Sequence, residues 1–61
     1  MEKQIPSVGA MLECEDIYGE KSWWIVAGIQ NEELVLKHYN EPFQTRFTFK
    51  AYLGATNWSA V

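Results

Sequence analysis

The chain has 61 residues, of which 48% are hydrophobic, and its eight acidic and five basic side chains give a formal net charge of −3. This length suffices for one domain, residues 1–61, and a domain so short buries only about 60% of the surface that its unfolded chain exposes. The composition excludes an intrinsically disordered chain, which would be poorer in hydrophobic residues. The acidic balance argues against duplex nucleic acid as a partner, because binding to phosphates requires a stripe of basic side chains.

Few groups in the sequence are suited to metal binding or catalysis, since Cys14 is the only cysteine and His38 the only histidine. A structural zinc site needs four ligands, which these two residues cannot supply. We therefore expect no metal and no cofactor. A catalytic pair of Cys14 and His38 is disfavoured, because Cys14 lies on the predicted inward face of a strand. Glycine-rich phosphate loops and the G-x-S-x-G motif are absent, and we expect no enzymatic activity.

The N-terminal segment, residues 1–8, is predicted to be a lead-in that becomes ordered only where it docks on the domain. It lacks the apolar stretch of a signal peptide, and no apolar run in the chain approaches the length of a membrane span, about 18 residues. We expect an intracellular, cytoplasmic protein without membrane contact.

Two strands and a hairpin loop are predicted in the first half of the chain. Residues Ala10–Ile17 alternate in character and form a half-buried strand, with Leu12 and Cys14 on its inward face. The polar, glycine-containing segment Tyr18–Ser22 is typical of a hairpin loop. Trp23–Ile29 is rich in aromatic and β-branched residues and predicts a second strand. Because this strand is apolar throughout, we expect a central strand that is covered on both faces or binds a partner with one face.

A third strand and the turns around it follow from the next residues. Gly28, inside the second strand, predicts a β-bulge, and Gln30–Glu32 predicts a turn. The alternation over Leu34–Tyr39 predicts the third strand. Asn40–Pro42 ends it in a loop, because proline has no amide donor for a sheet ladder.

A fourth strand is predicted over Gln44–Leu53, where alternation returns. Gly54 ends this strand, and Ala55–Val61 fits either a short fifth strand or a single helical turn. The fourth strand is amphipathic, and one of its two faces consists of Phe47, Phe49, Ala51 and Leu53, opposite Arg46, Thr48, Lys50 and Tyr52.

Together these elements predict an all-β fold. Four or five short strands joined by tight turns form an antiparallel meander that must curl or close to protect its edges. We expect a small antiparallel SH3-like barrel of four to five strands, with Trp58 as the plug at its open end. The alternative is a curled antiparallel sheet capped by a short C-terminal helix.

Nine aromatic residues are more than one small core can hide, because each large ring would bury about 150–250 Å². We therefore expect some rings at the surface. Trp23 and Trp24 are adjacent on a strand and face opposite ways, so one of them can be core while the other is exposed. The sequence leaves open which of the two is exposed. Three further rings have two alternative roles, to bind a partner or to cap the end of the core: Tyr39, Phe43 and Phe47.

Several segments between Val8 and Phe49 resemble the Tudor-like domains, small SH3-like barrels that bind methylated lysine or arginine in an aromatic cage. Three segments are similar to the family's first three strands: Val8–Cys14, the aromatic-led Ser22–Trp24, and Leu34–Tyr39. Tyr39-Asn40-Glu41-Pro42-Phe43 places an acid between two rings, similar to the family's aromatic, Asp, aromatic pattern, with Glu41 where Asp is usual. Tyr18 lies in the first loop, where such domains often place another cage ring. The resemblance implies a site in which ring faces hold a methylammonium ion, and a nuclear location.

We expect a non-catalytic protein-interaction module that binds a peptide or protein partner, and the acidic charge of the chain favours a basic partner. One alternative is a small acidic effector of a phage or mobile element that binds and inhibits a host protein. Another is a structural homodimer that buries the apolar strand Trp23–Ile29. The predicted binding surface consists of Tyr18, Trp23, Trp24, Tyr39, Glu41 and Phe43.

Overall fold

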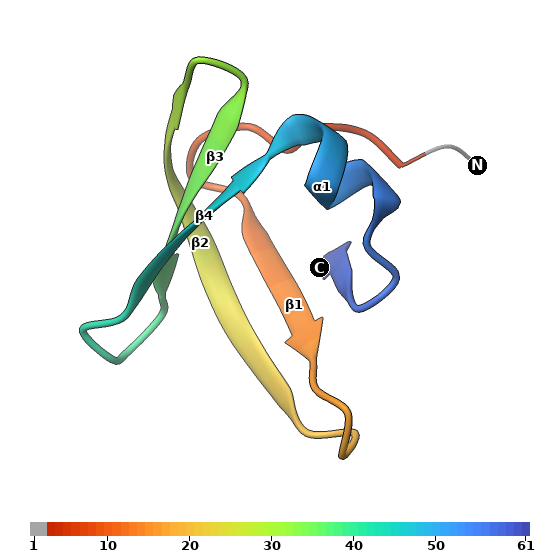
Figure 1. Cartoon of the computed structure of the whole chain (residues 1–61). Coiled ribbons are helices and arrows are strands. Elements are labelled where there is room, and N and C mark those ends of the chain that lie inside the picture. The colour runs from red at the N-terminus through yellow and green to blue at the C-terminus, as the bar shows by residue number, and fades with distance from the viewer. Residues whose placement is uncertain (1–2) are drawn as a thin grey trace.

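The computed structural model describes residues 3–61, so the first two residues of the predicted lead-in, Met1 and Glu2, lie outside the described part. The chain forms one antiparallel sheet of five strands in the order β4-β3-β2-β1-β5 (Figure 1). The predicted all-β antiparallel fold is therefore confirmed. The elements in chain order are β1 (Met11–Glu15), β2 (Lys21–Gln30), β3 (Glu33–His38), β4 (Gln44–Thr48), α1 (Phe49–Gly54) and β5 (Trp58–Ala60).

The sheet curls but is not closed into a barrel. β4 and β5 are its two edge strands, and no backbone ladder joins them within residues 3–61. In the chain, α1 follows β4 directly and leads into the turn before β5 (Figure 1). Its Tyr52 is only 1% exposed and packs in the same cluster as Leu12 and Trp58. The fold is thus a curled sheet with a short helix, and this helix precedes the last strand instead of ending the chain.

The core lies on one face of the curled sheet. Leu12 of β1 is fully buried and Cys14 packs against the core, so the predicted inward face of the first strand is confirmed. Trp58 is also buried, but in the core of an open sheet and not as the plug of a closed barrel, and it starts a strand rather than a helical turn. The cluster of buried residues consists of Leu12, Val26, Leu34, Leu36, Tyr52 and Trp58.

The central strand β2 carries the predicted bulge. Val26 pairs with Leu36 and Gly28 with Val35, so Ala27 is an extra residue on the β2 side of the ladder. A bulge bends the strand and increases its twist, which favours the curl of the sheet. The neighbouring turn is a tight two-residue connection between Gln30 and Glu33. Its central residues, Asn31 and Glu32, both have positive φ, 48° and 61°, as in the type I′ turns that match the twist of hairpin strands.

The predicted fourth strand, Gln44–Leu53, is wrong beyond Thr48, where α1 begins. The Thr48 hydroxyl accepts a hydrogen bond from the Ala51 amide at 3.0 Å and so caps a helix. Phe49 and Tyr52 are three residues apart and lie on the same side of a helix. Because Phe49 packs against the core and Tyr52 lies within it, helical periodicity buries two rings where strand periodicity would expose Tyr52.

The lead-in docks on α1 through Lys3. Its ammonium group donates hydrogen bonds to the carbonyl oxygens of Tyr52 at 2.8 Å and Ala55 at 2.9 Å. The same Nζ lies 4.2 Å from the centre of the Tyr52 ring, a cation–π distance. Burial lowers the pKa of Lys3. A cation at this position satisfies carbonyl groups at the C-terminal end of the helix, and Ile5 adds apolar contact with the core.

Candidate functional site

The loop between β3 and β4 is organised by His38, the last residue of β3. The His38 amide donates to the Phe43 carbonyl at 2.9 Å and closes the hairpin. Its ring nitrogen Nδ1 accepts from the backbone amides of Asn40 at 3.3 Å and Glu41 at 3.2 Å. The histidine thus fixes the loop in which the sequence predicted two rings and an acid.

Four rings meet at this loop, and we name them the aromatic cluster: Trp23, His38, Tyr39 and Phe43. Trp23 and Tyr39 stand perpendicular, with ring centres 6.3 Å apart and an interplanar angle of 89°. The imidazole lies 5.5 Å from the Tyr39 ring and 6.0 Å from the Phe43 ring. Trp23, Tyr39 and Phe43 are 37%, 51% and 57% exposed. The cluster therefore presents three large rings to solvent, linked through ring contacts with Tyr39 and His38.

Trp24 connects this cluster to the core. Its ring centre lies 5.0 Å from that of His38 and 5.8 Å from that of Trp58. Trp24 Nε1 donates to the Ser22 hydroxyl at 3.0 Å, so the indole polar group has a partner. Trp24 is half-buried whereas Trp23 is exposed, which answers the question that the sequence left open. Trp24 thus links the core to His38, which in turn contacts the Tyr39 and Phe43 rings.

The remaining predicted site residues differ in their placement. Glu41 is exposed in the loop and is held through its backbone amide. Tyr18 lies in the turn between β1 and β2, which Figure 1 shows apart from the β3–β4 loop. Tyr18 is 85% exposed and makes no ring–ring contact with the described residues. The structure therefore brings together Trp23, Trp24, Tyr39, Glu41 and Phe43, and it leaves Tyr18 separate.

Cys14 and His38 are too far apart to act as a catalytic pair. Cys14 pairs with Ser22 and His38 with Trp24, so the two residues lie two strands apart and out of register by two residues. Two strand spacings alone amount to about 10 Å. Burial raises the pKa of the Cys14 thiol, the nearby Asp16 carboxylate also raises it, and a hydrogen bond with Ser22 opposes them. Burial and the Asp16 carboxylate therefore favour the thiol form of Cys14 over the thiolate.

Two hollows lie away from the aromatic cluster. One, of about 300 Å³, is lined by the polar side chains Glu13, Glu15, Asp16, Thr56, Asn57 and Ser59. The other, of about 820 Å³, is more apolar and lies between the lead-in, α1 and β5. Within residues 3–61, no group of three His, Cys, Asp or Glu side chains is placed to hold a metal ion. None of the helices in this part of the chain has the length and apolarity that crossing a membrane demands.

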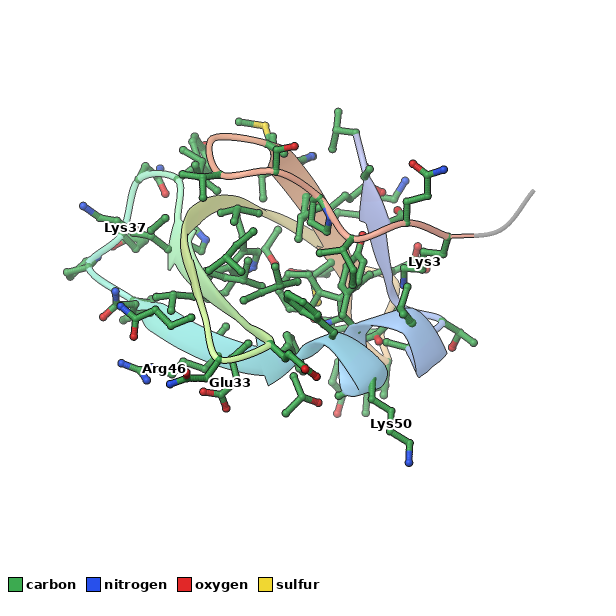
Figure 2. All side chains as sticks on the ribbon, turned by 90° about the horizontal axis from the view of Figure 1, so that it is seen from above. Lys3, Glu33, Lys37, Arg46 and Lys50 are labelled. Carbon is green, nitrogen blue, oxygen red and sulfur yellow. The ribbon has the colours of Figure 1, made fainter. Side chains whose placement is uncertain are left out.

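Basic side chains do not gather on one face of the molecule. Figure 2 shows Lys37 and Arg46 at one end of the view and Lys50 at the other, while the Lys3 ammonium bonds with carbonyl groups of Tyr52 and Ala55. The fifth basic residue, Lys21, pairs with Glu13, with Nζ 3.2 Å from a carboxylate oxygen. Comparison with known proteins adds no relative: no family model matches the sequence, and neither the curated proteins nor the solved structures contain a match.

Proposed function

We propose that the chain is a non-catalytic protein-interaction module that binds a peptide or protein partner through the aromatic cluster. The observation that carries this proposal is that Trp23, Tyr39 and Phe43 are all more than one-third exposed. Tyr39 and Phe43 each pack against the His38 ring, and Trp23 packs against Tyr39. Exposed Trp and Tyr side chains are the residues that contribute most to protein interfaces. Rings that are already fixed lose little conformational entropy on binding, which favours affinity.

The sharper form of the proposal is a Tudor-like cage for a methylated lysine or arginine. Trp23 and Tyr39 are perpendicular and would supply two walls, Phe43 lies on the same loop, and Glu41 would supply the carboxylate. A methylammonium ion is attracted to aromatic faces within about 6 Å of the ring centre. The β3–β4 loop would therefore supply two rings and the charge, and β2 would supply the third ring, Trp23.

The test compares two peptides that differ only in one side chain, trimethyl-lysine or unmodified lysine. We expect the trimethylated peptide alone to shift the Trp23 indole and Tyr39 amide signals in NMR titrations. Tyr39→Ala and Phe43→Ala should each weaken binding about tenfold, because each removes a ring whose burial contributes more than about 1.4 kcal/mol. Tyr18→Ala is the matched control, since it removes an exposed ring outside the cluster. Equal shifts with both peptides would refute the cage, and no shift with either would contradict peptide binding at this site.

A second candidate function is a small acidic effector that binds and inhibits a host protein. The observation that favours it is the polar hollow of about 300 Å³, to which Glu13, Glu15 and Asp16 contribute carboxylates. In this function, the replacement Glu15→Gln would weaken inhibition of the target, whereas Phe43→Ala would not. The opposite pattern would favour the aromatic cluster.

The structural homodimer is distinguished by its association state. The outer face of β1 and β2 presents Met11, which is 40% exposed, together with Trp23 and its neighbour Ile25. Sedimentation equilibrium at micromolar concentration measures the result directly. A persistent dimer that Trp23→Ser dissociates would favour the homodimer over a monomeric binding module.

A further inference from the structure

The turn between β1 and β2 carries two apolar side chains that do not pack in the core. Ile17 is 90% exposed and Tyr18 is 85% exposed, and these are the highest exposures of any large hydrophobic side chain in the described part of the chain. Both residues lie outside the buried cluster and the partly buried side chains packed on it. Removal of apolar surface from water is favourable, and for these two side chains a binding partner would have to provide it.

This tip is held in one backbone conformation. One carboxylate oxygen of Asp16 accepts from the amides of Tyr18 at 2.8 Å and Glu20 at 2.9 Å. The backbone groups of Asp16 bond with the Gly19 amide at 3.0 Å and the Glu20 carbonyl at 2.9 Å. Gly19 has a φ of 83°, in the left-handed region that glycine adopts at low cost. A turn fixed in this way presents Ile17 and Tyr18 with little backbone entropy left to lose on binding.

The charge around the tip determines which surface it fits. Residues 13–21 contain four acidic residues and Lys21, a net charge of −3, which equals the net charge of the whole chain. The rest of the sequence has four acidic and four basic residues and is neutral. Because the only positive charge in the hairpin is already paired with Glu13, the hairpin repels phosphates and anionic lipids and attracts basic surfaces.

We infer that the β1–β2 tip is a second, separate binding epitope, in which Ile17 and Tyr18 enter an apolar patch on a partner protein that lysine and arginine side chains border. A second copy of this chain fits poorly, because its own apolar hollow has Lys3 as the single charged residue in its lining. The inference extends the proposed interaction function to another surface. Because the tip and the aromatic cluster are probed by different variants, failure of one proposal leaves the other measurable.

The experiment uses a defined probe, an amphipathic helical peptide with a leucine stripe bordered by lysine and arginine. Its matched control replaces each basic residue with glutamate. Isotope-labelled protein is titrated with each peptide, and affinities are measured for the wild type, Ile17→Ser, Tyr18→Ser and Tyr39→Ser. Melting temperatures of the variants check the fold, which these exposed positions should leave unchanged.

We expect the basic probe to shift the amides of residues 15–20 and the acidic probe to leave them unchanged. Ile17→Ser and Tyr18→Ser should each lower affinity about tenfold, whereas Tyr39→Ser should change it less than about twofold. Affinity should fall as the salt concentration rises from about 50 to about 300 mM. The inference is overturned if the two peptides bind alike, if Tyr39→Ser weakens binding as much as the tip variants, or if the tip variants instead dissociate a homodimer.

Discussion

The β1–β2 turn and the β3–β4 loop are held by the same kind of hydrogen bond but differ in what lies behind them. One oxygen of Asp16 accepts from two backbone amides in the first turn, and one nitrogen of His38 accepts from two in the second. Asp16 is exposed, whereas the His38 ring also packs on Trp24 and through it on the core. Substitution of the exposed Ile17 or Tyr18 in the first turn should therefore change binding without changing stability, whereas substitution of His38 behind the second loop should change both.

The largest effect on stability is expected from Trp24→Ala. Because the Trp24 ring contacts both His38 and Trp58, its removal should lower the free energy of unfolding by about 3 kcal/mol. Urea denaturation followed by circular dichroism measures the change, and Tyr18→Ala, with an expected loss below about 0.5 kcal/mol, is its control. Similar losses for both variants would contradict the contrast between a supported and an unsupported turn.

His38→Asn separates the two roles of the histidine. Asparagine at a turn can still accept a backbone amide two residues on, but it lacks the ring that packs between Trp24 and Phe43. We expect a loss of about 1–2 kcal/mol in the free energy of unfolding and altered NMR signals from Tyr39 and Phe43. If His38→Asn matched the wild type while His38→Ala did not, the hydrogen bonds alone would support the loop.

Asp16→Ala and Asp16→Asn form the corresponding pair in the other turn. Alanine removes the acceptor of two backbone amides and should cost about 1 kcal/mol, while asparagine keeps an acceptor oxygen and should cost less. Hydrogen exchange at the Tyr18 and Glu20 amides reports the change locally. If Asp16→Ala speeds exchange at the Tyr18 and Glu20 amides but leaves exchange of core amides unchanged, the turn is independent of the core. Faster exchange at the Leu36 amide would contradict this independence.

The smallest effect concerns Cys14, which pairs with Ser22 close to the β1–β2 turn. Since its pKa is raised above the usual thiol value, less thiolate is present at about pH 8 than in the unfolded chain. Alkylation by iodoacetamide at that pH should be slower in the folded protein than in urea. Asp16→Asn should speed it slightly, because the carboxylate is one of the groups that raise the pKa. An unchanged rate in urea would show that the thiol is neither buried nor perturbed.

Alternation predicted the strands well because one face of each strand packs on the core. The predicted and observed strands agree within two residues at each end of β1, β2 and β3, and the bulge at Gly28 and the turn before Glu33 are confirmed. The helix was missed because Phe47, Phe49, Ala51 and Leu53 also alternate. The helix is selected by the Thr48 cap, a local contact with Ala51 that alternation does not reveal, and by the burial of Tyr52, which depends on tertiary structure.

The candidate site was predictable in part. That rings exceed the capacity of the core follows from composition, and the exposure of Tyr18, Trp23, Tyr39 and Phe43 confirms it. The sequence did not reveal His38 as the residue that fixes the loop. Its position at the end of a predicted strand, two and three residues before Asn40 and Glu41, is the only local sign of that role. Sequence order also could not separate Tyr18 from the other rings.

The bulge in β2 has a consequence for the shape of the molecule. Ala27 has no partner in β3, and Val26 and Gly28 pair with the consecutive residues Leu36 and Val35. Deletion of Ala27 would therefore preserve every cross-strand pair on both sides of it and turn the hairpin into a regular, straighter ribbon. Ala27 adds curvature to β2 although it pairs with no residue of β3. The presence or absence of this one residue therefore changes the curvature of the sheet and leaves the register of β2 and β3 the same.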